Sequence, residues 1–95
     1  MNQDVLYQII KDRINSSPSG SYVAGLVQKG ITSVTQKVGE EAVETVIAAL
    51  KDSEQRLIEE MADLWFHSLV LLAAKNIDPE KVWQELSNRH QSKNA

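Results

Sequence analysis

The residues best suited to chemistry are two short clusters of acidic side chains. Glu40, Glu41 and Glu44 form the first cluster, and Glu60 and Asp63 form the second. Both clusters lie in segments with helical periodicity, where residues three or four apart share one face, so each segment can aim two carboxylates in one direction. If the two helices pack antiparallel, the pairs converge. Carboxylates gathered in one cleft repel one another until a hard cation binds, and Mg²⁺ is the cation that this pattern predicts.

The first cluster by itself also fits a plainer interpretation. Glutamates on helices usually face solvent, and at about 100° per residue Glu41 and Glu44 share a side with Lys37. The apolar residues of the segment lie on the opposite side: Val43, Val46 and Leu50. This is the pattern of an ordinary amphipathic helix with a solvated acidic side.

The second cluster is harder to explain in that way. Nearly every residue from Met61 to Ala74 is apolar, and a helix that is apolar almost all round is a buried one. Glu60, Asp63 and His67 form one narrow polar stripe on it. Burying an ionised carboxylate without a partner costs on the order of several kcal/mol, so Asp63 should meet a cation, a basic side chain or a proton. Imidazole is a poor ligand for Mg²⁺, so we expect His67 to support a metal ligand or to contact a substrate.

Basic residues near the acids leave two interpretations open. Salt bridges from Arg56 and Lys37 could neutralise the carboxylates without a metal, although the repeated two-carboxylate form on both helices favours a metal. Lys37 could instead hold a substrate phosphate beside the ion. Lys29, Ser21 and Tyr22 could join it, because the short segment that carries them leads directly into the acidic helix.

Helical segments must position these residues, and the sequence predicts about five of them. Periodicity and end signals place them at residues 5–15, 22–28, 31–50 and 54–75, and from Asp78-Pro79 onward. Asp4 and Ser21 are the predicted N-caps of the first two, and the polar stretch 87–95 is predicted to be a frayed end. No segment has the period of a strand, so the predicted fold is all-α.

Composition limits the classes of function. Ninety-five residues make one small domain, expected at residues 1–90 with a polar tail at 91–95, and so short a chain buries a limited core, which favours self-association. A net charge of -3 argues against nucleic-acid binding, which needs a basic surface. There is no cysteine, no signal-peptide pattern at the N-terminus and no apolar run long enough to span a bilayer. We therefore expect a soluble cytoplasmic protein.

Four blocks, taken in order, resemble the phosphoribosyl-ATP pyrophosphohydrolase family of histidine biosynthesis. They are SYVAGLVQKG, QKVGEEAVETVIAAL, EEMADLWFHSLVLLAA and DPEKVWQELSNRH. The acidic pattern alone, EExxE followed by ExxD, is similar to that of the wider all-α, MazG-like nucleoside triphosphate pyrophosphohydrolases. One mild departure is Gly25, which stands where the family leads us to expect a larger polar residue.

The resemblance implies an all-helical fold in which an antiparallel helix pair completes a four-helix bundle core in a homodimer, or in a tetramer built from dimers. It implies Mg²⁺-dependent hydrolysis of phosphoribosyl-ATP to phosphoribosyl-AMP and pyrophosphate. In the family pattern the metal ligands correspond to Glu41, Glu44, Glu60 and Asp63. Glu40 is the candidate for orienting or deprotonating the attacking water, and Glu44 competes with it for that role.

Two other functions stay open at this point. A house-cleaning pyrophosphohydrolase that acts on another nucleoside triphosphate would use the same carboxylates. A non-catalytic helical dimerisation module would instead pair its acids with Arg56 and Lys37. Arg89 and His90 could reach a site across a dimer interface, which the sequence does not decide.

Overall fold

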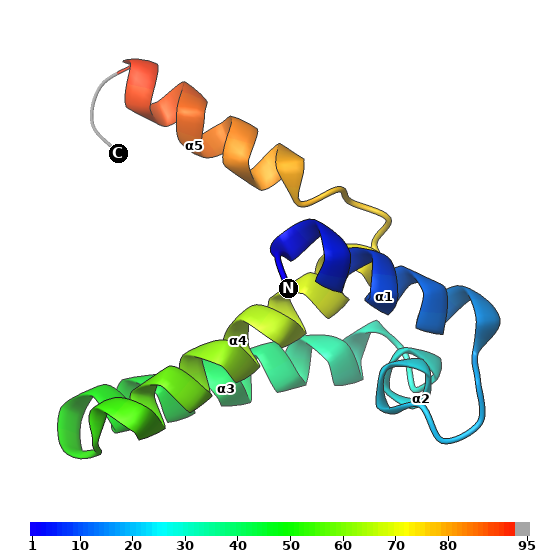
Figure 1. Cartoon of the computed structure of the whole chain (residues 1–95), viewed down its shortest axis with the longest axis horizontal. Helices are drawn as coiled ribbons and strands as arrows, with labels where there is room; N and C mark the ends of the chain where they lie inside the picture. The colour runs from blue at the N-terminus through cyan, green and yellow to red at the C-terminus, as the bar shows by residue number, and fades with distance from the viewer. Residues whose placement is uncertain (93–95) are drawn as a thin grey trace.

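In the computed structural model, which describes residues 1–92, the chain folds into five α-helices and the described part contains no strand (Figure 1). The helices are α1 (Gln3–Ser16), α2 (Tyr22–Gln28), α3 (Ile31–Lys51), α4 (Glu54–Ala74) and α5 (Glu80–Ser92). The predicted all-α fold and its five helices are therefore confirmed. The first helix begins earlier than expected because Asn2, rather than Asp4, is its N-cap and accepts a hydrogen bond from the Val5 amide.

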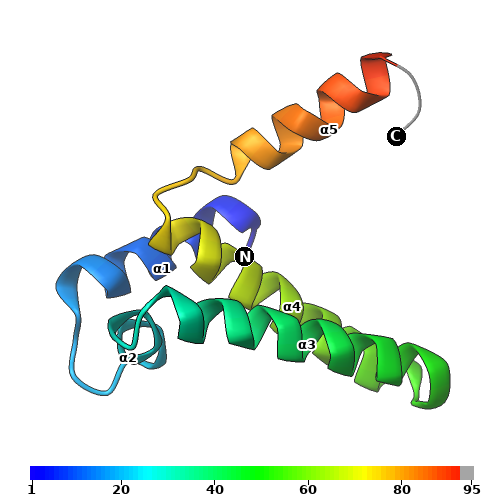
Figure 2. The ribbon, with the colours of Figure 1, turned by 180° about the vertical axis from the view of Figure 1, so that it is seen from behind.

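The two longest helices form an antiparallel pair, as predicted. Helices α3 and α4 have 21 residues each and lie side by side in both ribbon views (Figures 1 and 2). Asp52 and Ser53 alone connect them, and Ser53 begins α4 by accepting a hydrogen bond from the Arg56 amide. A link this short forces the chain to reverse direction, so the part of α3 that carries Glu41 faces the part of α4 that carries Glu60 and Asp63.

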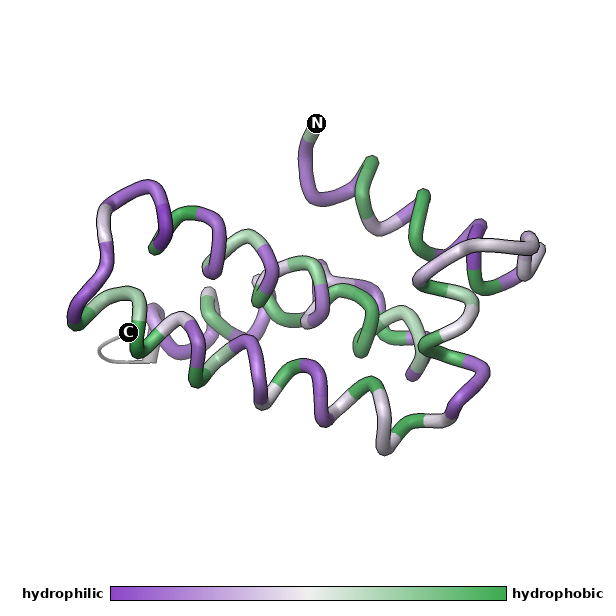
Figure 3. The backbone as a smooth tube through the Cα atoms, turned by 90° about the horizontal axis from the view of Figure 1, so that it is seen from below, coloured by the Kyte–Doolittle hydropathy of each residue, from purple (hydrophilic) through white to green (hydrophobic). Residues whose placement is uncertain are grey.

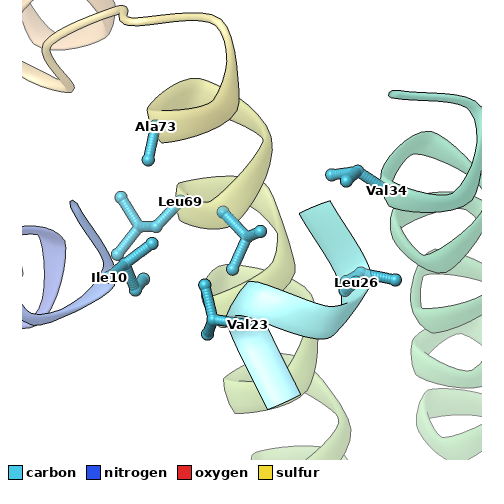
Figure 4. Close-up of a cluster of buried hydrophobic side chains, with 7 residues drawn as sticks. Ile10, Val23, Leu26, Val34, Leu69 and Ala73 are labelled. Carbon is cyan, nitrogen blue, oxygen red and sulfur yellow. The ribbon is translucent and has the colours of Figure 1, made fainter. Parts of the chain in front are cut away.

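The hydrophobic core lies at one end of this pair, where α1 and α2 pack against it. It is built from side chains of four helices (Figure 4): Ile10, Val23, Leu26, Val34, Leu69, Val70 and Ala73. Ile10, Val34 and Val70 are the largest of the fully buried side chains. Gly30, with φ 108°, makes the sharp turn between α2 and α3 that only a residue without Cβ adopts easily. The core thus fixes α2 next to the middle of α4.

Helix α3 is turned the opposite way from the expectation for an ordinary amphipathic helix. Its acidic side packs inward, since Glu41, Thr45 and Ala48 are buried. Its apolar side faces outward, with Val46 58% exposed and Leu50 81% exposed. Figure 3 shows the alternation of hydrophobic and hydrophilic residues along both long helices. The small side chains on the inward side let α3 approach α4 closely, while nothing in the described part of this chain covers the apolar side.

Helix α4 is also less buried than its apolar sequence indicates. Ile58 and Trp65 are exposed, Trp65 by 67%. The expectation that α4 is buried almost all round is therefore wrong for a single chain, because α1, α2 and α3 cover only part of its circumference. None of the described helices is long and apolar enough to cross a membrane.

Helix α5 projects away from the rest of the chain, beyond α1 (Figures 1 and 2). Its base is held by a hydrogen bond from the Trp83 indole to the Gln3 side chain, 3.3 Å long. An apolar groove of about 590 Å³ lies between α5, the start of α1 and α4, with Trp65 and Trp83 in its lining. The helix continues to Ser92, further than expected, and the last three residues of the predicted tail lie outside the described residues.

Candidate metal centre

Three carboxylates meet where α3 faces α4. Glu41 comes from α3, and Glu60 and Asp63 come from α4, one turn apart; one carboxylate oxygen of each lies within 4.8 Å of the others. The antiparallel packing of the two helices brings them together, as the spacing of the acids in the sequence predicts.

The burial of the three differs from the expectation. Glu41 and Glu60 are each only 6% exposed, whereas Asp63 is exposed. The argument that Asp63 would be the costly buried charge is therefore wrong. The cost of burying a charge falls instead on Glu41 and Glu60, because both side chains lie at the interface between α3 and α4.

Each buried glutamate has one oxygen paired and one oxygen unpaired. The Lys37 ammonium lies 3.4 Å from Glu41 Oε1, and the Arg56 guanidinium lies 2.5 Å from Glu60 Oε1. The Oε2 atoms of both glutamates are buried and have no hydrogen-bond partner. The salt bridges that could have explained these acids without a metal are thus present, but they satisfy only half of each carboxylate. A buried polar atom without a partner is costly, so the two Oε2 atoms call for a cation or a proton.

Glu44 lies beside the three carboxylates, on the exposed rim of the cluster. Hydrogen bonds to Glu41 and to Glu60, together with the negative charge of both, raise the pKa of the Glu44 carboxyl above its ordinary value. Two ionised carboxylates cannot hydrogen-bond to each other, so a contact of this kind forms only when one of the two groups carries a proton. The shift is the expected response of crowded acids in the absence of a cation.

Glu40 is exposed and is not one of the three carboxylates that meet. Its Oε2 accepts a hydrogen bond from Gln36 at 3.1 Å, and its Oε1 lies 3.5 Å from the Lys37 ammonium. Lys37 therefore bridges Glu40 and Glu41. Partial burial lowers the pKa of Lys37, but the hydrogen bond to Glu41 and nearby negative charge outweigh that effect, so its pKa lies above the ordinary value. Lys37 thus stays an ammonium at the edge of the acidic cluster.

The remaining predicted site residues divide into two groups. Tyr22 and His67 are joined, since the Tyr22 hydroxyl lies 2.7 Å from His67 Nε2, and His67 Nδ1 lies 2.8 Å from the backbone oxygen of Asp63. Ser21 is the N-cap of α2, where its hydroxyl accepts from the Ala24 amide. Lys29 ends α2, at the opposite end of that helix from Tyr22. Arg89 and His90 lie in the last turn of α5, which projects away from the cluster.

Comparison with known proteins decides the family. The family model described as phosphoribosyl-ATP pyrophosphohydrolase matches residues 4–90. The chain belongs to this family. Among its relatives is a protein of Saccharolobus solfataricus named phosphoribosyl-ATP pyrophosphatase, 50% identical over 86 residues, which are 90% of this chain and 92% of the relative. A protein of the same name from Sulfolobus acidocaldarius is 48% identical over 86 residues, 90% of each chain. The family resemblance of the sequence is thereby confirmed.

In this member of the phosphoribosyl-ATP pyrophosphohydrolase family, the acidic cluster has the chemistry that Mg²⁺ requires. All of its donors are hard carboxylate oxygens, and two of them are buried and unpaired. Mg²⁺ prefers one or two such protein carboxylates and takes its remaining ligands from water and substrate phosphates. The exposed side of the cluster, at Asp63 and Glu44, leaves room for them.

Sequence reasoning missed one residue of this site, Thr45. Its buried hydroxyl lies 2.8 Å from the backbone oxygen of Glu41 and 3.2 Å from that of Glu60. It therefore ties together the two helices at the level of the buried glutamates. Its position one turn after Glu41, on the same side, was a usable signal, but a threonine in a helix commonly bonds its own preceding turn and nothing in the sequence pointed to the second contact.

Proposed function

We propose that the protein hydrolyses phosphoribosyl-ATP to phosphoribosyl-AMP and pyrophosphate, with Mg²⁺ held by Glu41, Glu44, Glu60 and Asp63. The single observation that carries the proposal is the pair of buried, unpaired Oε2 atoms of Glu41 and Glu60 at the α3–α4 interface. Such atoms are rare in folded proteins. In a chain of this family, a divalent ion is the partner that best suits them.

The reaction breaks the anhydride bond between the α and β phosphorus atoms, and water supplies the new P–O bond. When bound, Mg²⁺ neutralises the charge that grows on the phosphate oxygens during this step. Glu44 takes the proton of the attacking water, because its carboxyl lies on the exposed rim of the cluster, beside the buried glutamates. Glu40 is less suited to that role, since Gln36 and Lys37 already occupy both of its oxygens.

Lys37 steadies the phosphates in this mechanism. Its ammonium has three donors, and the two carboxylates it faces, Glu40 and Glu41, leave one donor for a phosphate oxygen. Its elevated pKa keeps the positive charge that this contact needs.

The test is pyrophosphate release from phosphoribosyl-ATP, measured with Mg²⁺ and with a chelator. Asp63→Ala should abolish release while the helical circular dichroism signal persists. Glu54→Ala is the matched control, since it removes an exposed acid from the first turn of the same helix. Release that survives in Asp63→Ala, or that does not depend on Mg²⁺ in the natural protein, would contradict the proposal. A faster reaction on other nucleoside triphosphates would favour a house-cleaning enzyme.

The protein acts, we further propose, as a homodimer in which a second copy covers the apolar side of α3. Val43, Val46 and Leu50 expose on one side of a single helix the residues that normally form a core. Ile58 and Trp65 of α4 are exposed as well, and Trp65 lies in the lining of the groove beside α5. Two copies that paired these surfaces would bring two α3–α4 pairs together as a four-helix bundle.

A further inference from the structure

The hydrogen bonds of His67 determine which group donates in its contact with Tyr22, beside the candidate metal centre. His67 is 6% exposed and lies one turn after Asp63 on α4. Its Nδ1 faces the backbone oxygen of Asp63 at 2.8 Å. A carbonyl oxygen only accepts, so Nδ1 carries the proton. In the neutral ring Nε2 is then a bare acceptor, and the Tyr22 hydroxyl, 2.7 Å away, must donate to it.

This direction restricts what Tyr22 can bind. A phenol has one proton, and here His67 takes it, so the hydroxyl oxygen can only accept further hydrogen bonds. It cannot donate to a phosphate oxygen, which itself only accepts. The Tyr22 residue is 53% exposed, and its ring is held by contacts with Phe66 and, edge to face, with His67. The oxygen is therefore fixed in place within reach of solvent or of a bound molecule.

We propose that Tyr22 accepts a hydrogen bond from a ribose hydroxyl of the substrate and that His67 is a positioning residue, which acts through Tyr22 without touching the substrate. This inference rests on the proposed function, because the carboxylates must hold the triphosphate next to Tyr22. The sugar is the part of a nucleotide that directly adjoins the phosphates and carries donors. A base amino group also donates, but it lies further from the phosphates.

Three variants separate this role from a merely structural one. Tyr22→Phe removes the acceptor and should raise KM by roughly 3- to 10-fold with little change in kcat, the size expected for one hydrogen bond. His67→Asn keeps a donor near the position of Nδ1 but does not reach Tyr22, so it should raise KM to the same extent. His67→Gln places an amide oxygen near the position of Nε2 and should recover most of that loss.

Combined changes test whether the two residues act as one unit. The double variant Tyr22→Phe/His67→Asn should be no worse than either single variant, because both remove the same contact. For an analogue of phosphoribosyl-ATP that lacks a ribose hydroxyl next to the triphosphate, the natural protein should have the same raised KM. Tyr22→Phe should not raise the KM for this analogue any further. Melting curves of every variant, recorded alongside, identify losses that come from unfolding. Tyr22→Phe removes a single hydroxyl from a half-exposed residue and keeps the test valid if the His67 variants fail to fold.

The outcomes distinguish the two proposals. Absence of Mg²⁺-dependent release in the natural protein would end the proposed function. If the natural protein is active, unchanged KM in Tyr22→Phe would overturn the role of Tyr22 alone. Equal loss in His67→Asn and His67→Gln, matched by their melting temperatures and with no split between KM and kcat, would reduce His67 to a structural residue. A deoxy substrate that still responds to Tyr22→Phe would show that the partner is not the sugar.

Discussion

The two sides of α3 contrast more sharply than any other two surfaces of the molecule. The inward side holds charged and small residues, among them Glu41 and Thr45, and the outward side holds Val43, Val46 and Leu50. A helix that served only the stability of one chain would be turned the other way round. This orientation leaves two features of α3 that the described part of the chain does not satisfy: the buried acid on its inward side and the exposed apolar residues on its outward side.

Replacing the inward charge should have the largest effect. Glu41→Gln keeps the shape of the side chain but removes the charge, so we expect Mg²⁺-dependent pyrophosphate release to fall by at least about 100-fold. The same change should raise the melting temperature in the absence of Mg²⁺, because it removes one unpaired buried carboxylate oxygen. Parallel activity and melting measurements on the metal-free protein check both parts.

The control for that pair of effects is Glu59→Gln, which alters an exposed acid of α4 that pairs with Arg56 outside the cluster. It should leave the metal-free melting temperature nearly unchanged. If Glu41→Gln instead lowered the melting temperature of the metal-free protein, the ion pair between Glu41 and Lys37 would stabilise the fold by more than the unpaired Oε2 atom destabilises it. The contrast between the two sides of α3 would then weaken.

Adding charge to the outward side should have the next largest effect. Val46→Asp should turn the dimer into a monomer that stays helical, since Val46 is 58% exposed within one chain and the new carboxylate remains in water there. Light scattering coupled to gel filtration measures the mass, and circular dichroism measures the helix content. Lys51→Asp, at the end of the same helix and on a different side, is the matched control and should remain dimeric. If the natural protein were monomeric at assay concentration, no second copy would cover the apolar side of α3, and the proposed dimer would fail.

How much of this could be read from the sequence depends on whether a feature is local. Helix positions, the antiparallel pair and the convergence of Glu41, Glu60 and Asp63 follow from spacing along the chain and from a short connection, and the structure has them all. Burial does not follow from spacing. Glu41 and Glu60 rather than Asp63 are the buried acids, because burial depends on how α3 and α4 are rotated against each other, which the spacing of residues does not set.

The same distinction between local and long-range features explains two contacts of the site that the sequence did not predict. The link between Tyr22 and His67 spans 45 positions and depends on where the core places α2 against α4. The second contact of Thr45 depends on how closely α3 approaches α4. From the sequence we expect Tyr22 to contact a substrate and His67 to support a metal ligand or contact a substrate. Only the packing of the helices shows that the two side chains contact each other.

A smaller effect should follow from Thr45, which joins the inward sides of both helices. Thr45→Val keeps the shape and removes the hydroxyl, so the backbone oxygen of Glu60 loses its contact. We expect the free energy of unfolding to fall by about 1 kcal/mol, measured by urea denaturation. Thr35→Val is the matched control, because that hydroxyl bonds only its own helix at an exposed position. Equal losses in both variants would mean that the contact between the helices contributes nothing.

The smallest and most discriminating change is at Gly39, which lies on the outward side of α3, two turns before Val46. Nothing lies within 4 Å of a Cβ built there, and its φ is ordinary, so Gly39→Ala should stabilise a free helix by roughly 0.5–1 kcal/mol. The full gain should appear in the monomeric Val46→Asp background, and a smaller gain in the dimer, where a second copy would meet the added methyl group. Gly25→Ala on α2 has equally open space and should give the same gain in both backgrounds. Equal gains at Gly39 in the two backgrounds would mean that no second copy approaches this part of α3, and the covering surface would then have to begin beyond it, toward Leu50.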